Sequence, residues 1–171
     1  VPASRWLVED SAHLAALRYM AHVSDAELFD SARFAISPAE ASWMDPQQRM
    51  LLEKGYVALH HAGHGRSSLL AHDTAVVVGI QAHDFVTITF EKARTSALPV
   101  YGVSGSTFSV AAGRLSYVLG MQGACFNTDT ACSTALVAAH AAATMVRDAE
   151  CEGALTVAVN LLLLPMGHVL V

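Results

Sequence analysis

The amino-acid sequence predicts a layered α/β fold, because short apolar strands alternate with helical segments along the chain. Residues 74–80 (TAVVVGI) and 154–159 (ALTVAV) are apolar runs rich in β-branched side chains, which is typical of strands buried on both faces. The chain has 171 residues, the size of one domain. Its composition, 53% apolar and 15% charged, excludes intrinsic disorder.

Two helices in the first half have recognisable starts. Pro38 begins one of them, with Ser37 as the N-cap and Glu40 placed as in a capping box. Pro46 begins the other, with Asp45 as its N-cap. The remaining expected elements, in order, are a short helix over 11–23, the end of the second helix at 61–65, a strand over 74–80, a loose polar stretch over 81–106, a helix over 109–119 ending at Gly120, a strand over 124–128, a helix over 133–147 and a strand over 154–159.

Cys132 lies on the turn between an expected strand and an expected apolar helix. The first turn of a helix carries a partial positive charge and unpaired N–H groups, and both stabilise a thiolate. The same N–H groups can stabilise the oxyanion that forms when sulfur attacks a carbonyl carbon. Most free cysteines are small buried thiols, however. The local pattern therefore leaves two possibilities, a nucleophile and a packing residue.

The sequence around Cys132 (TDTACSTALVAAH, 128–140) resembles the active-site segment of β-ketoacyl synthases. The likeness is greatest to the ketosynthase domains of modular polyketide synthases and related type I fatty acid synthases. Further similar blocks follow the family's order and cover nearly the whole chain: 28–53 with its ISPAE and MDPQQR strings, 73–80, 101–123, and 154–165 with its VNLLL string.

This resemblance implies a thiolase-like fold of layered α-β-α type and a decarboxylating Claisen condensation. Cys132 would accept an acyl group, and its backbone N–H would form half of the oxyanion hole. An enolate from a malonyl-type extender would then attack the acyl-cysteine, giving a 3-oxoacyl thioester two carbons longer. Thr107 and Phe108 would contribute to the wall near the acyl channel and the dimer contact.

The resemblance also implies the partners. The domain itself would bind no cofactor, because acyl and malonyl-type groups arrive as thioesters on the phosphopantetheine of an acyl carrier protein. The complete domain would form a homodimer and act with other synthase domains. A cytoplasmic location is expected, with a plastid as a possibility.

Several other features exclude classes of function. The net charge of −5 argues against a nucleic-acid partner. No membrane span is expected, since Asn160 and Pro165 interrupt the apolar segment 153–171. No metal site is expected at His60, His61 and His64, which lack an acidic or cysteine partner at ligand spacing.

Four polar or thiol side chains receive structural interpretations. Arg49, at the end of the DPQQR string, is expected to form fixed ion pairs. Asp129 is expected to be a buried hydrogen-bonding residue beside the turn. Cys125 and Cys151 are expected to be packing thiols.

Residues 1–171 are expected to be part of the N-terminal half of a ketosynthase. The family's first strand, its two catalytic histidines and its supporting lysine have no counterpart in this sequence, and the whole C-terminal half is absent. The chain alone is therefore expected to be inactive and only marginally stable. Two alternatives stay open, namely a non-catalytic ketosynthase-like fragment or pseudoenzyme that contributes a dimer surface, and a thiolase-type acyltransferase. The DPQQR and VNLLL strings speak against the second.

Overall fold

The computed structural model describes residues 21, 23–81, 84–94 and 100–164. Within them, a three-stranded parallel sheet forms the centre, in the order β2-β1-β3. The strands are β1 (Thr74–Ile80), β2 (Cys125–Thr128) and β3 (Gly153–Val159). Every residue of β1 is buried, as the sequence predicts. The same prediction was wrong for β3, where only Leu155 is fully buried, because β3 lies at the edge of the described sheet.

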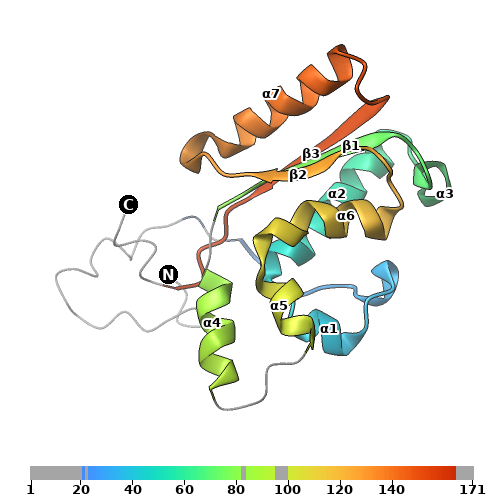
Figure 1. Cartoon of the computed structure of the whole chain (residues 1–171). Coiled ribbons are helices and arrows are strands. Elements are labelled where there is room, and N and C mark those ends of the chain that lie inside the picture. The colour runs from blue at the N-terminus through green and yellow to red at the C-terminus, as the bar shows by residue number, and fades with distance from the viewer. Residues whose placement is uncertain (1–20, 22, 82–83, 95–99, 165–171) are drawn as a thin grey trace.

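Helices cover both faces of the sheet (Figure 1), so the layered α-β-α prediction is confirmed. Helix α7 packs on one face, while α2 and α6 pack on the other. The described helices are η2 (Ala32–Phe34), α1 (Pro38–Ser42), α2 (Pro46–His61), α3 (Arg66–Leu69), α4 (Asp84–Ala93), α5 (Val100–Ser106), η3 (Phe108–Val110), α6 (Ala111–Leu119), η4 (Ala131–Ser133) and α7 (Thr134–Arg147), where η marks a 3-10 helix.

The alternation of side chains along β1 divides the core into two parts. Val76 and Val78 belong to the larger cluster, together with Leu115 of α6. Val77 points to the opposite face and packs against Ala138 of α7. Small residues on α7 therefore let this helix lie close to the sheet, whereas the α2–α6 side is filled by larger side chains.

The predicted helix starts are confirmed by their caps. Ser37 Oγ accepts a hydrogen bond from the Glu40 N–H at 3.1 Å, and Asp45 Oδ1 accepts one from the Gln47 N–H at 2.7 Å. At the other end of α6, Gly120 adopts φ 77°, the left-handed conformation that ends many helices. The helix expected over 11–23 lies almost entirely outside the described residues.

The stretch expected to be loose, 81–106, contains two helices, α4 and α5. The prediction was wrong for α4 because its β-branched residues 86–89 disfavour a helix locally. Tertiary packing overrides that preference, since Thr89 is buried. The prediction was wrong for α5 because Gly102 and Gly105 resemble loop glycines, although both are buried in this helix.

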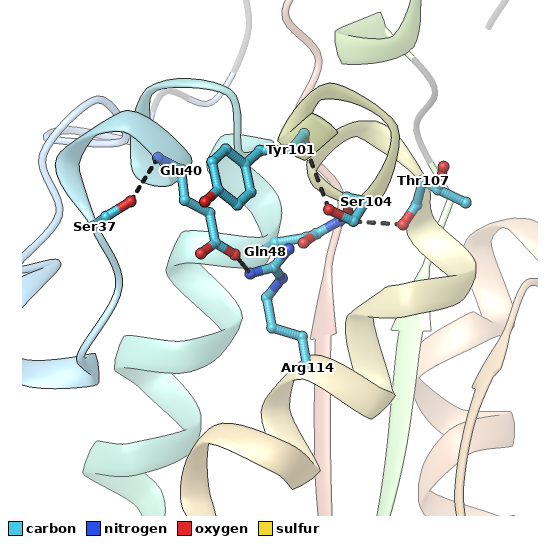
Figure 2. A network of polar contacts seen from close by, with 7 residues as sticks. All are labelled: Ser37, Glu40, Gln48, Tyr101, Ser104, Thr107 and Arg114. Carbon is cyan, nitrogen blue, oxygen red and sulfur yellow. Dashed lines mark hydrogen bonds and ion pairs between the residues drawn. The ribbon is translucent and has the colours of Figure 1, made fainter. Parts of the chain in front are cut away.

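Polar side chains join α1, α2, α5 and α6 (Figure 2). Glu40 of α1 forms an ion pair with Arg114 of α6. Gln48 of α2 donates from Nε2 to the carbonyl oxygens of Ser104 at 3.3 Å and Thr107 at 3.1 Å. These contacts fix the end of α5 beside the first turn of α2.

Arg49 departs from its expected role. Its Nη1 donates to the backbone carbonyl oxygen of Glu27 at 3.1 Å. No carboxylate of the described residues lies within ion-pair distance of it. The expected fixed ion pair is thus replaced by a hydrogen bond that holds residue 27 against α2.

None of the helices in the described ranges has both the length and the apolar character needed to cross a membrane. The apolar segment that begins at Gly153 opens with strand β3, which pairs along its length with β1.

Candidate active site

A strained turn connects β2 to α7. Ala131 has φ 55°, a left-handed conformation that is uncommon for any residue except glycine, asparagine and aspartate. Hydrogen bonds hold its peptide on both sides. The Ala131 N–H donates to Asp129 Oδ1 at 3.0 Å, and the Ala131 carbonyl accepts from Thr134 Oγ1 at 2.6 Å. Thr134 Oγ1 also accepts from the Thr130 N–H at 2.8 Å. The turn is therefore fixed by its own side chains.

Cys132 follows this strained residue inside η4, two residues before α7 begins at Thr134. It is exposed. No described residue accepts a hydrogen bond from its backbone N–H. The 14 residues of α7 direct the positive end of their aligned dipoles toward this turn. The turn therefore places an exposed thiol beside a backbone N–H that could donate to an oxyanion.

Cys132 lines a pocket of about 250 Å³. The pocket lies at the carboxyl ends of the parallel strands, where ligands of such sheets bind. The strand register brings these ends together, since Gly79 of β1 is aligned with both Thr128 of β2 and Ala158 of β3. The pocket is lined by Gly79, Gln81, Ala131, Cys132, Thr134, Ala135, Ala158, Val159 and Asn160.

Gly79 lets the start of α7 approach the sheet. A Cβ at this position would lie 2.8 Å from Thr134 Cγ2 and 3.1 Å from the Ala158 Cβ. Any side chain would push Thr134, and with it the turn, away from the sheet. Gly79 was not singled out from the sequence, although a glycine inside an apolar strand indicates a close approach of another segment.

The segment that follows β3, next to the pocket, forms hydrogen bonds with side chains that are far away in the sequence. Gln47 Oε1 accepts a hydrogen bond from the Leu161 N–H at 3.0 Å. Asp84 Oδ2 accepts from the N–H groups of Leu163 at 2.8 Å and Leu164 at 2.9 Å. Gln47 was interpreted only as part of a capped helix start, and Asp84 was not singled out. No local pattern predicts these partners, because they lie far apart in the sequence.

Asp45 is a buried carboxyl group, with 3% of its surface exposed. Burial raises the pKa of Asp45 to about 6, and the charge of Asp84 acts in the same direction. The hydrogen bonds from Gln47 and the charge of Arg49 oppose this rise in the pKa. The carboxyl group of the native protein therefore holds a proton at a pH where the unfolded chain has released it.

Replacing Asp45 by asparagine should change how stability depends on pH. Between about pH 4 and pH 6 the native state binds more protons at Asp45 than the unfolded state, so its contribution to stability falls as pH rises. At about 1.4 kcal/mol per pH unit, the change is of the order of 3 kcal/mol. In Asp45→Asn, the amide oxygen can still cap α2. When melting temperatures are measured from pH 4 to pH 8, the melting temperature of the variant minus that of the unmodified protein should rise with pH up to about pH 6 and then stay constant. A constant difference would contradict this prediction.

Thr107 and Phe108 do not line the Cys132 pocket among the described residues. Both are half-buried. Thr107 Oγ1 donates to the Val103 carbonyl oxygen at 2.7 Å, and Phe108 packs against the larger core cluster. The structure thus brings neither of them to the thiol in this part of the chain.

Two of the smaller structural interpretations need correction. Asp129 forms the expected hydrogen bond beside the turn, but it is exposed rather than buried. Cys125 is exposed on β2, so it is not a packing thiol within the described structure, whereas Cys151 is buried as expected. Across the described ranges, no three histidine, cysteine or acidic side chains gather in a way that could hold a metal ion.

The parallel sheet, its two helical layers and the cysteine-bearing turn define a fragment of the N-terminal half of a thiolase-like fold. The chain belongs to the β-ketoacyl synthase family, since the family model described as "Beta-ketoacyl synthase, N-terminal domain" matches residues 1–171.

The curated relatives of this chain include bacterial polyketide synthases. The chain is 44% identical over 148 residues to the phenolphthiocerol synthesis polyketide synthase type I Pks15/1 of Mycobacterium bovis, covering 86% of this chain and 7% of that protein. It is 38% identical over 172 residues to a phenolphthiocerol/phthiocerol polyketide synthase of Mycobacterium tuberculosis, covering 96% and 11%. The chain therefore spans about a tenth or less of these relatives. They are bacterial proteins, so they give no support to a plastid location.

Solved ketosynthases share the fold. The ketosynthase from module 6 of the bacillaene synthase of Bacillus subtilis 168 superimposes with a TM-score of 0.79 at 34% identity, covering 98% of this chain and 26% of that one. The oxazolomycin ketosynthase domain OzmH KS7 of Streptomyces albus JA3453 gives a TM-score of 0.75 at 31% identity, covering 86% and 25%. The chain spans about a quarter of these domains.

Proposed function

We propose that this chain carries the nucleophile of a ketosynthase that lengthens an acyl chain in polyketide biosynthesis. The observation that carries the proposal is the setting of Cys132, which is exposed at the positive end of α7 with its backbone N–H free of any described acceptor. The relatives, which are polyketide synthases, favour a polyketide over a fatty acid product.

In the proposed first step, the Cys132 thiolate attacks the carbonyl carbon of an acyl thioester. The backbone N–H of Cys132 stabilises the resulting oxyanion. A carbon–sulfur bond forms to Cys132 as the bond to the phosphopantetheine sulfur breaks, and the carrier protein leaves as its thiol. The strained turn holds the sulfur in place before the substrate arrives.

In the second step, a malonyl-type extender on an acyl carrier protein loses carbon dioxide. The enolate carbon attacks the acyl-cysteine carbonyl, a carbon–carbon bond forms, and the Cys132 sulfur leaves as the thiolate. The product is a 3-oxoacyl thioester two carbons longer. Residues outside this chain would support decarboxylation, as the family resemblance implies. Within the complete domain, a homodimer would form, and Thr107 and Phe108 would lie near the acyl channel.

Acyl trapping tests this proposal in the full-length enzyme. After incubation with an acyl pantetheine thioester, peptide mass spectrometry should find the acyl group on Cys132. The exposed Cys125 is an internal control for accessibility, and it should stay unmodified. Equal acylation of the two thiols, or none at Cys132, would favour a non-catalytic fragment. Acyl-Cys132 that forms but accepts no carbon from a malonyl thioester would favour a thiolase-type acyltransferase.

A further inference from the structure

We propose that Gln47 and Asp84 are positioning residues for the acyl-transfer step, because they fix the backbone that forms one wall of the Cys132 pocket. Neither side chain lines this pocket. Both act through residues 159–164, the segment that leaves β3. This inference rests on the proposed role of Cys132 as the acyl-accepting nucleophile.

The wall in question needs support from side chains. Val159 is the last residue of β3, and Val159 and Asn160 line the same pocket as Cys132. From residue 160 to residue 164 the chain is neither helix nor strand, so its N–H groups have no ladder partners. Buried N–H groups require acceptors. Those acceptors determine where this segment lies.

Gln47 supplies the first acceptor from the start of α2. Its side chain is 1% exposed, and its Oε1 accepts from the N–H of Leu161, a residue that is itself buried. The amide group of Gln47 is oriented from its other end, since Nε2 lies 3.4 Å from Asp45 Oδ2. The Gln47 N–H donates to Asp45 Oδ1 at the same cap. The cap of α2 therefore fixes the position of Gln47 Oε1, the atom that accepts from the Leu161 N–H.

Asp84 supplies the second acceptor from the first turn of α4. One carboxylate oxygen, Oδ2, accepts from two successive N–H groups, those of Leu163 and Leu164, at 2.8 and 2.9 Å. Hydrogen bonds to a carboxylate are stronger than those between neutral groups. Gln47 of α2 and Asp84 of α4 thus bind the backbone of residues 161–164, which continues from the pocket-lining residues Val159 and Asn160.

Small displacements near a reacting atom have large kinetic effects. A misplacement of about 1 Å can cost about a hundredfold in rate. Loss of Gln47 leaves the buried Leu161 N–H without this acceptor, and loss of Asp84 does the same for the half-buried N–H groups of Leu163 and Leu164, so the segment is expected to move toward other partners. We therefore expect these residues to affect the rate at which Cys132 is acylated, although neither contacts the thiol.

The neighbouring glutamine offers a matched control. Gln48 lies on the same turn of α2 and is buried to the same degree, at 2% exposed. Its described hydrogen bonds run to the carbonyl oxygens of Ser104 and Thr107, at the end of α5 (Figure 2). Gln47→Met and Gln48→Met each remove one buried amide, so similar costs in stability are expected. Only Gln47→Met releases the segment that continues from the wall of the Cys132 pocket, because Ser104 and Thr107, the partners of Gln48, do not line that pocket.

The test is single-turnover acylation of the full-length enzyme by an acyl pantetheine thioester, followed by mass spectrometry of the Cys132 peptide. A purely structural role lowers the fraction of enzyme that reacts and leaves the rate constant unchanged. A positioning role lowers the rate constant at full amplitude. We expect Gln47→Met to lower the rate constant by about tenfold or more, and Gln48→Met to change it less than about twofold.

Asp84 provides a second pair of variants if Gln47→Met fails to fold. Asp84→Ala should slow acylation as Gln47→Met does, and Asp84→Asn should restore the rate, because its amide oxygen can accept both hydrogen bonds. Normal rate constants in Gln47→Met or Asp84→Ala, or a loss of amplitude alone, would overturn the inference and leave the role of Cys132 intact. If the unmodified enzyme transfers no acyl group to Cys132, the proposed function and the inference both fail.

Discussion

Replacing Cys132 by serine is expected to slow acyl transfer by at least about 10³-fold. The hydroxyl group of serine ionises far less readily than a thiol, and among the residues that the structure describes no base lies in the pocket lining to take its proton. The backbone N–H and the positive end of α7 would be retained in the variant, so the expected loss of rate comes from the weaker nucleophile. The measurement is the rate of acyl-enzyme formation, followed by the rate of condensation with a malonyl thioester.

The same substitution should leave stability almost unchanged. Cys132 is exposed, and exposed substitutions usually change the free energy of unfolding by less than about 0.5 kcal/mol. Cys125→Ser is the matched control, since this thiol is also exposed and lies on β2, outside the pocket lining. It should keep full activity. If Cys132→Ser kept its activity while Cys125→Ser lost it, the assignment of the nucleophile would be wrong.

The parts of the fold that could be predicted from the sequence are those specified by local chemistry. The apolar run of β1 predicts a strand buried on both faces, and Ser37 and Asp45 predict helix starts that their hydrogen bonds confirm. Cys132 could be found because a cysteine between a strand and a helix has a specific electrostatic setting. The resemblance to ketosynthases then favoured the proposal of a nucleophile, and the structure shows that this thiol is exposed.

The parts that could not be predicted depend on distant partners. Local preference disfavours a helix at the β-branched residues of α4, yet packing of Thr89 places one there. Gln47 meets Leu161 across 114 positions of the chain, and no short pattern carries that pairing. The left-handed conformation of Ala131 is equally hidden, because alanine has no preference for it. Asp129 lies between an expected buried strand and an apolar helix, which suggested that it is buried. In the structure it is exposed.

Adding a single methyl group at Gly105 is expected to destabilise the fold by about 3 kcal/mol. A Cβ there would lie 2.1 Å from the Trp43 carbonyl oxygen, 2.8 Å from the Trp43 carbonyl carbon and 3.1 Å from Met44 Cα. All three atoms belong to the backbone, so no side-chain rotation can relieve the overlap. The Asp45 N–H also donates to the Gly105 carbonyl oxygen at 2.8 Å. Helix α5 would have to move away from the start of α2 and weaken this bond.

Gly113→Ala is the control for Gly105→Ala, because it makes the same change in a helix where there is room. Nothing lies within 4 Å of a Cβ at Gly113 in α6. Alanine favours a helix over glycine by about 0.5–1 kcal/mol, so this variant should be slightly more stable than the unmodified protein. Thermal unfolding of the complete domain should show Gly105→Ala melting about 2 °C lower, because a domain about four times the length of this chain has a large unfolding entropy, with Gly113→Ala unchanged or higher. Equal melting temperatures for the two variants would mean that α5 does not depend on close contact with the first turn of α2.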